Sequence, residues 1–198
     1  FNDFMTYNSG DWTITTTEAG GGDASEAVTS SAGGALLITN DAADNDADFF
    51  NLKGEGFKLS SSKKAYFSAR FKVSDATQSD FVMGLQITDT TPLAVSDGVF
   101  FIKDDGDTNL DFIVEKDSTS TDTTAIHTME DDTFVTTSFF IDPDRAAVYY
   151  SINNGTPVKV ANTNLPDDEE LTISFGIQNG EAAAKTMTID YVTAMVER

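Results

Sequence analysis

Carboxylate side chains are the most abundant groups in this sequence that could do chemistry, with 33 Asp and Glu among 198 residues. A retaining glycoside hydrolase needs two carboxyl groups about 5 Å apart. A strand supplies them at alternate positions, in a pattern such as Glu-x-Asp-x-x-Glu. Glu115-Lys116-Asp117 begins this pattern, but Ser120 stands where the second Glu would be. The sequence therefore predicts no catalytic carboxylate pair of this kind.

The sequence gives no more support for nucleophilic catalysis than for glycoside hydrolysis. His127 is the only histidine, it stands between Ile126 and Thr128, and no nucleophile motif accompanies it. A Ser-His-Asp triad needs an activated hydroxyl held beside the imidazole. The chain has no Cys, so disulfides and thiolate metal sites are ruled out as well. We expect no enzymatic activity and assign no catalytic residue.

Calcium is the best small-ligand candidate. Asp105, Asp107 and Asn109 stand at alternating positions, as oxygen ligands do at the start of a calcium loop. However, Leu110 stands where such a loop needs Gly, and no Glu closes it. The same residues fit a hairpin turn between strands at 99–103 and 110–116. We expect the turn and no cofactor, with calcium as the weaker alternative here and at the carboxylates of residues 41–48.

Aromatic side chains suggest two kinds of contact. Trp12, Tyr149 and Tyr150 are candidates for sugar binding, although a core or sheet-face role is the stronger expectation for all three. One ring of the adjacent pair should face the core and the other should face out, since strand side chains alternate. The N-terminal segment is a candidate anchor for a protein partner, or else it completes a sheet beside the last strand. Its large apolar residues are Phe1, Phe4, Met5, Tyr7 and Trp12.

The charge balance limits the partners of the chain. Twelve Lys and Arg face 33 Asp and Glu, which gives a formal net charge of -21. Nucleic acids and anionic membranes are bound mainly through clustered basic residues, and the only adjacent basic pair is Lys63-Lys64. No apolar run approaches the roughly 18 residues that a membrane span requires. We expect no nucleic acid and no membrane as partners.

The elements that position these residues are strands. Apolar residues alternate with polar ones over 64–73, 80–88 and 110–114, as expected for strands with one buried face. Residues 99–102 are apolar on both faces, as in a central strand. About a dozen strands without an amphipathic helix favour a two-sheet sandwich. We predict an all-β fold, a two-sheet antiparallel jelly-roll β-sandwich, as a single domain over 1–198. Its core should be packed with phenylalanine.

Turns and loops are also predictable. Residues 18–34 are rich in Gly, Ser and Ala and should form a surface loop, and residues 116–124 should form a turn or an exposed flap. Asp142-Pro143-Asp144-Arg145 suits a type I turn. Asn154-Gly155 is a strong hairpin signal, because a type I′ turn needs positive φ at both central residues.

Several segments, read in order, resemble virion structural proteins of tailed bacteriophages, particularly head-attached proteins with a concanavalin A-like or laminin-G-like jelly roll. The resemblance covers nearly the whole chain and depends on the combination, since each segment alone is common in β-sandwiches. The segments are Gly10-Asp11-Trp12, residues 43–49, 66–75 and 81–103, Phe175-Gly176-Ile177-Gln178-Asn179-Gly180-Glu181 and Ile189-Asp190-Tyr191.

The resemblance implies a capsid decoration or accessory protein on the outer surface of the virion. Its partner would be the major capsid protein, and it could act as a homo-oligomer that reinforces the shell. The acidic surface favours the outside, because a lumen-facing protein of this charge would repel packaged DNA. The alternative is a carbohydrate-binding, lectin-like module of a phage tail or a secreted protein, which rests on analogy of fold.

Overall fold

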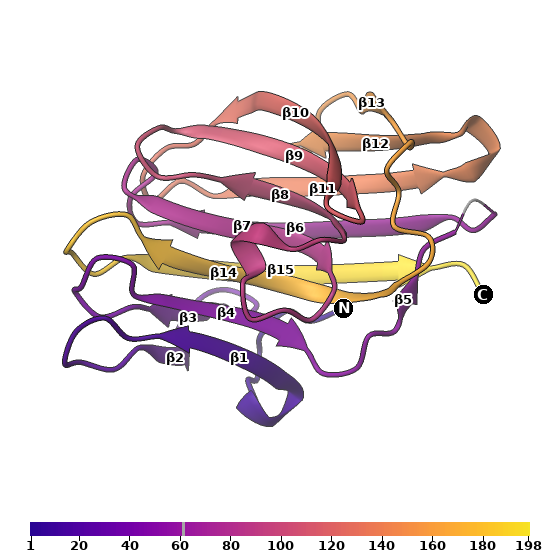
Figure 1. The fold of residues 1–198 in the computed structure, drawn as a ribbon. Coiled ribbons are helices and arrows are strands. Elements are labelled where there is room, and N and C mark those ends of the chain that lie inside the picture. Colours follow the sequence, from indigo (N-terminus) through magenta and orange to yellow (C-terminus); the bar gives the residue numbers. More distant parts are fainter. Residues whose placement is uncertain (61) are drawn as a thin grey trace.

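Two antiparallel sheets packed face to face make up the computed structural model, which describes residues 1–60 and 62–198 (Figure 1). The 8-stranded sheet has the order β1-β4-β14-β7-β8-β9-β10, with β5 paired to β14. The 7-stranded sheet has the order β13-β12-β11-β6-β15-β3-β2. The predicted fold class, an all-β jelly-roll sandwich, is confirmed.

The strands occupy most of the ranges that the alternation predicts. Those of the 8-stranded sheet are β1 Trp12–Thr17, β4 Ala47–Leu52, β5 Phe57–Lys58, β7 Ser79–Gln86, β8 Gly98–Lys103, β9 Asn109–Lys116, β10 Thr119–Thr128 and β14 Glu170–Asn179. Those of the 7-stranded sheet are β2 Ser25–Val28, β3 Leu36–Thr39, β6 Ala65–Val73, β11 Val135–Asp142, β12 Ala147–Ile152, β13 Val158–Ala161 and β15 Thr186–Val196.

Three short 3₁₀ helices, η1 Ser9–Asp11, η2 Pro92–Ala94 and η3 Pro143–Arg145, are the helices of the described residues. None of the helices in this part of the chain is long and apolar enough to cross a bilayer.

Phenylalanine fills the space between the sheets, as predicted. Phe67 of β6 stacks on Phe139 of β11 with centroids 5.1 Å apart, and Phe50 stacks on Phe175 at 5.2 Å. These rings lie on the inward faces, because side chains of successive residues point to opposite sides of a strand. Their burial provides the main driving force for folding in a chain without disulfides.

A second apolar layer covers the outer face of the 8-stranded sheet. Phe49 and Phe100 lie there with Val95 of the β7–β8 loop. Gly84 and Gly176 make room for the two rings, since a Cβ on either glycine would come within 2.5 Å of Phe100 Cα or Phe49 Cα. The loop that carries η2 crosses this face in Figure 1. Both faces of β8 are therefore covered, as its apolar sequence predicts.

Two loop predictions were wrong. Within residues 18–34, Ser25–Val28 forms the edge strand β2, paired with β3. Within residues 116–124, only Asp117 and Ser118 form a turn, with φ of 51° and 58°, and β10 begins at Thr119. β2 and β10 are edge strands. Because an edge strand buries little side-chain surface, its sequence does not need to alternate between apolar and polar residues. Backbone hydrogen bonds to the neighbouring strand form nevertheless.

Two turns differ in detail from the prediction. The β12–β13 hairpin is present, but the positive φ angles fall on Asn153 (51°) and Asn154 (56°), and the Gly155 N–H donates to the carbonyl of Ile152. The turn is thus one residue earlier than Asn154-Gly155. Pro143 begins η3, and Ala146 follows it in the left-handed region at φ 46°.

Candidate functional site

A row of aromatic side chains crosses the outer face of the 7-stranded sheet. Tyr149 of β12 is in register with Phe140 of β11, Phe140 with Tyr66 of β6, and Tyr66 with Met195 of β15. We call these four residues the aromatic row. Neighbouring strands lie about 4.8 Å apart, so the row extends over roughly 14 Å. The three rings are half-buried and Met195 is 57% exposed.

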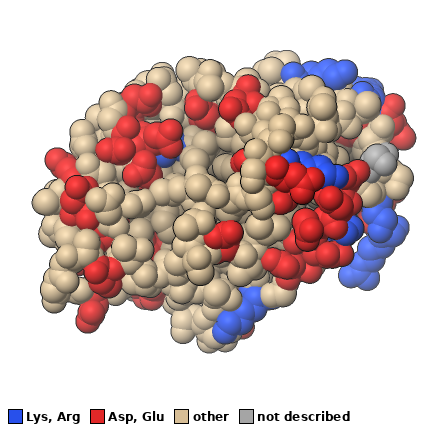
Figure 2. All heavy atoms as spheres, in the orientation of Figure 1, with Lys and Arg blue, Asp and Glu red and all other residues tan. Residues whose placement is uncertain are grey.

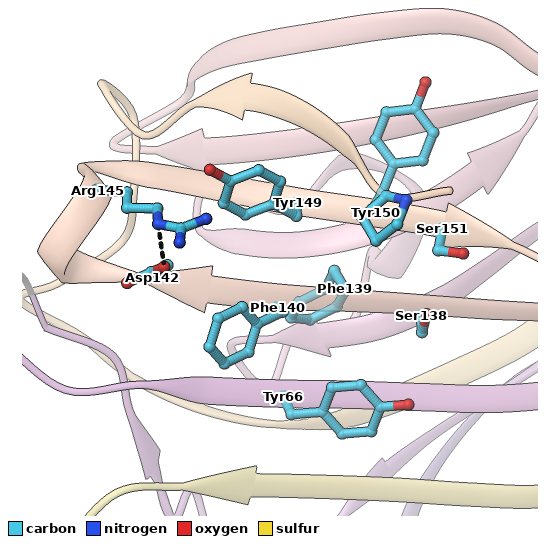
Figure 3. Close-up of a pocket in the computed structure, with 10 residues that line it drawn as sticks. Tyr66, Ser138, Phe139, Phe140, Asp142, Arg145, Tyr149, Tyr150 and Ser151 are labelled. Carbon is cyan, nitrogen blue, oxygen red and sulfur yellow. Dashed lines mark ion pairs between the residues drawn. The ribbon is translucent and has the colours of Figure 1, made fainter. Parts of the chain in front are cut away.

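Two adjoining hollows follow this row. One, of about 310 Å³, lies on the Tyr149 side and is also lined by Ser138 and Ser151. The other, of about 350 Å³, lies on the Met195 side. Both are lined by Tyr66 and Phe140. Figure 3 shows the rings of Tyr149, Phe140 and Tyr66 on three successive strands. The hollow on the Tyr149 side has a volume at the lower end of those typical of small-ligand sites, and the hollow on the Met195 side is wide open to solvent.

The ion pair of Arg145 and Asp142 lies at the Tyr149 end of the row. Arg145 Nε lies 3.5 Å from Asp142 Oδ2 (Figure 3). The pKa of Arg145 is raised mainly by the Tyr149 hydroxyl beside the guanidinium and, to a smaller extent, by the Asp142 carboxylate. Asp142 is only 9% exposed, and its Oδ1 receives no hydrogen bond from the described residues. A buried carboxylate oxygen without a donor is energetically unfavourable. The atom has almost no exposed surface, so a ligand hydroxyl would have to displace a neighbouring side chain to donate to it.

The three aromatic candidates from the sequence occupy different places. Tyr149 is in the row. Tyr150 faces the core, 5.3 Å from Phe112. Trp12 is buried against Phe175 at 5.0 Å. The expectation that one ring of the adjacent tyrosine pair faces inward is confirmed.

Sequence reasoning missed Tyr66 and Phe140 as site residues. Both residues lie on the outward faces of their strands, and the alternation of apolar and polar residues is enough to predict that orientation. Their proximity to Tyr149 depends on the pairing of β6 with β11, and these strands lie about 70 residues apart in the chain.

The N-terminal residues proposed for partner binding separate into two groups. Phe4 and Trp12 belong to the core, whereas Phe1 is 81% and Met5 69% exposed. Asn2 forms a bridge with Val192 of β15, so the segment lies beside the last strand, as the alternative reading expected. Tyr7 is partly exposed, and burial of its ring, together with Glu26 and Asp48, raises its pKa to about 12. Accessible apolar surface here is concentrated on Phe1 and Met5.

The calcium candidates form the β8–β9 hairpin turn. Asp107 Oδ1 accepts the Asn109 backbone N–H at 2.6 Å, and the Asp105 N–H donates to Asp80. The buried Lys103 ammonium donates to backbone carbonyls beside them, including that of Asp104 at 2.7 Å. No group of three or more Asp, Glu or His among the described residues could hold a metal ion. A lysine thus supplies the positive charge next to this acidic turn.

The outer face of the 8-stranded sheet carries the other notable group of carboxylates. Asp111 and Glu115 of β9, with Asp122 of β10, line a hollow of about 300 Å³. Burial raises the pKa values of Asp111 and Glu115, and the nearby Asp122 contributes to both shifts. Asp117 does not share this face, because it lies in the turn, where its N–H donates to Asp97. The incomplete glycanase pattern at 115–120 therefore does not form a carboxylate pair.

The remaining sequence candidates lie apart from the aromatic row. His127 is partly buried and lines a hollow of about 180 Å³ at the end of β10. Asp46 and Asp48 are buried, and the Asp46 carboxylate accepts the backbone N–H groups of Ala19 and Ala43. Asp and Glu are spread in several groups over the face of the 8-stranded sheet, with Lys and Arg mostly toward the right of the view (Figure 2).

No family model matches the sequence, and no curated protein matches it. Solved structures match over nearly the whole chain. A Bacteroides ovatus mixed-linkage glucan GH16 protein, in complex with a product, is 14% identical with a TM-score of 0.68, covering 98% of both chains. The Emp47p carbohydrate recognition domain is 14% identical, with a TM-score of 0.66 and coverage of 98% and 91%. A protein of unknown function from Shewanella oneidensis MR-1 is 17% identical, with a TM-score of 0.64 and coverage of 96% and 82%.

These similarities establish the class of fold. The chain is a concanavalin A-like jelly-roll sandwich, as the resemblance implied. Similar structures include carbohydrate recognition domains, glycoside hydrolases and a lyase, and one recognition domain was solved in a potassium-bound form. At this identity the likeness extends to the fold alone, because one fold hosts many functions. The matches give no support for a phage origin, so the virion role and the capsid partner stay predictions.

Proposed function

We propose that this protein is a carbohydrate-binding, lectin-like domain whose site is the aromatic row on the 7-stranded sheet. The proposal rests on two features that lie side by side. The half-buried rings of Tyr149, Phe140 and Tyr66 are in register with one another on neighbouring strands. Beside them, the buried Oδ1 atom of Asp142 has no donor among the described residues. Sugar rings present apolar C–H faces that pack on aromatic side chains, and hydroxyl groups that donate to carboxylates. The three rings of the row and Asp142 line one hollow, which brings both kinds of group together.

The similar structures support this proposal over the capsid role. They include carbohydrate recognition domains and glucan-acting enzymes, so proteins that handle glycans recur among those that share this fold. The charge of the chain also disfavours the polyanion class of ligand, as argued from the sequence.

Binding to a glycan array, followed by titration calorimetry on the best ligand, tests the proposal. Tyr149→Ala and Phe140→Ala should each weaken binding by about fivefold or more, since truncating an aromatic residue at the centre of a binding site costs more than about 1 kcal/mol. Phe134→Ala is the matched control. Phe134 lies on the same sheet face beneath Arg70, at 4.0 Å, but six residues along the chain from Phe140. Equal losses for all three variants, or no ligand on the array, would refute the proposal.

The second candidate, a capsid decoration protein, rests on the exposed Phe1 and Met5. Large apolar side chains at a surface can dock on a partner. Quantitative mass spectrometry of purified virions would decide this question. Hundreds of copies per particle would support a head-shell role, and a handful would indicate a tail or fibre.

A further inference from the structure

If the aromatic row binds a glycan, as proposed, we infer that its ligand is an internal stretch of at least three units of an uncharged glycan, lying across the strands. This inference names the ligand class of the proposed site. It depends on the length of the row and on the charges along it.

The length of the site exceeds that of one sugar. The row crosses four strands, and three strand spacings make about 14 Å. The two hollows adjoin each other, with Tyr66 and Phe140 lining both. The lining of the two hollows is therefore continuous from Tyr149 on β12 to Met195 on β15. A single ring or a disaccharide would leave the Met195 end empty.

The end of the row at Met195 is open to solvent. Lys64, Val196 and Glu197 line the hollow there, and the Lys64 backbone N–H donates to Glu197 Oε2 at 3.1 Å. β15 ends at Val196, directly after Met195, and the Met195 side chain is 57% exposed. A glycan chain can thus extend past the row instead of ending in it.

The two cations beside the row are already paired with carboxylates of the protein. Arg145 pairs with Asp142 at 3.5 Å, and Lys64 pairs with Asp144 at 3.1 Å. The buried polar atom beside the row that lacks a partner among the described residues is Asp142 Oδ1, an acceptor. A hydroxyl group can donate to it, whereas a uronate or sulfate would bring a second negative charge to the same place. The net charge of -21 further disfavours an anionic ligand at low salt.

Oligosaccharide ladders of one to six units test this inference. The neutral probes are fragments of mixed-linkage β-glucan, xylan and mannan, and the acidic probes are polygalacturonate fragments. Calorimetry should show that affinity for at least one neutral ladder rises about tenfold or more between one and three units. Acidic ladders should bind more weakly at every length.

Substitutions at the two ends distinguish the possible failures. Met195→Ala changes an exposed side chain, so the fold should persist, and the variant should lose the gain from the third unit while disaccharide binding is unchanged. Tyr149→Ala should weaken binding at every length. Saturation at two units, a neutral effect of Met195→Ala, or preference for polygalacturonate would overturn the inference while the proposed function stands. Failure of every ladder to bind would count against the proposed function itself.

Discussion

Replacing Asp48 by Asn should stabilise the protein at neutral pH and not at acid pH. Asp48 lies between the sheets on β4 and is 0% exposed. Its Oδ1 accepts a hydrogen bond from Thr16 Oγ1 at 2.6 Å, but its Oδ2 has no donor among the described residues. Burial, with Glu26 and Glu18 nearby, raises its pKa from 3.8 to about 6.

The sign of this effect follows from proton linkage. A carboxyl group with a raised pKa in the folded state binds its proton more tightly there than in the unfolded chain. Its contribution to stability is therefore fully present below pH 4 and is lost as pH rises through 6. The rise from 3.8 to about 6 corresponds to roughly 3 kcal/mol. The amide of the Asp48→Asn variant would carry no charge at any pH, so the variant should avoid this loss.

Urea unfolding between pH 4 and pH 8 measures the difference. Asp48→Asn should be more stable than the wild type by about 1 to 3 kcal/mol at pH 7.5, with the gain disappearing near pH 4. Asp46→Asn is the matched control. Both Asp46 oxygens accept backbone N–H groups, at 2.5 Å and 3.0 Å, so one donor would lose its acceptor and the variant should be destabilised. This reasoning would be refuted if Asp48→Asn were no more stable than the wild type at pH 7.5. It would also be refuted if the gain in unfolding free energy were the same at pH 7.5 and pH 4.

Three further changes have definite expectations. Gly84→Ala should lower the unfolding free energy by roughly 2 kcal/mol or more in a urea titration, because its Cβ would meet Phe100 Cα at 2.5 Å; a neutral result would contradict the close packing on that face. Lys103→Met should cost roughly 3 kcal/mol, because it removes the buried ammonium that donates to three backbone carbonyls; an unchanged melting temperature would show that this ammonium is dispensable. Incubation with mixed-linkage β-glucan should release no new reducing ends, and turnover that disappears in Glu115→Gln would contradict the expectation that the protein is not an enzyme.

Alternation in the sequence predicts the faces of β6 but not those of the whole of β15. It puts Met187, Ile189, Tyr191 and Met195 on one face, whereas a register shift between Ile189 and Tyr191 leaves Met187 and Ile189 in the core and turns Met195 outward. Phe67 and Phe71 of β6 point inward and Tyr66 points outward, as the pattern requires. Alternation does not reveal which strands are neighbours, since pairing is decided by packing over the whole sheet. The aromatic row exists because β6 pairs with β11 and β15, so its members could be recognised singly but not as a site.

Polar composition misled the prediction at the sheet edges. The β10 sequence from Thr119 to Thr128 contains few apolar residues, yet it pairs with β9 over most of its length. An edge strand has one hydrogen-bonded side and largely solvated faces, so its sequence can be polar. Asp142 illustrates a different limit. Its place after a strand and before Pro143 predicts a turn, but the orphaned carboxylate oxygen becomes visible only with the surrounding side chains in place.

The central claim is that a glycan binds on the 7-stranded sheet, and a structure of the protein with its best array ligand tests it most directly. Sugar rings should pack on Tyr149 and Phe140, with a hydroxyl group within hydrogen-bond distance of Asp142 Oδ1. A glycan bound instead in the acidic hollow of the 8-stranded sheet, against Asp111, Glu115 and Asp122, would contradict the account.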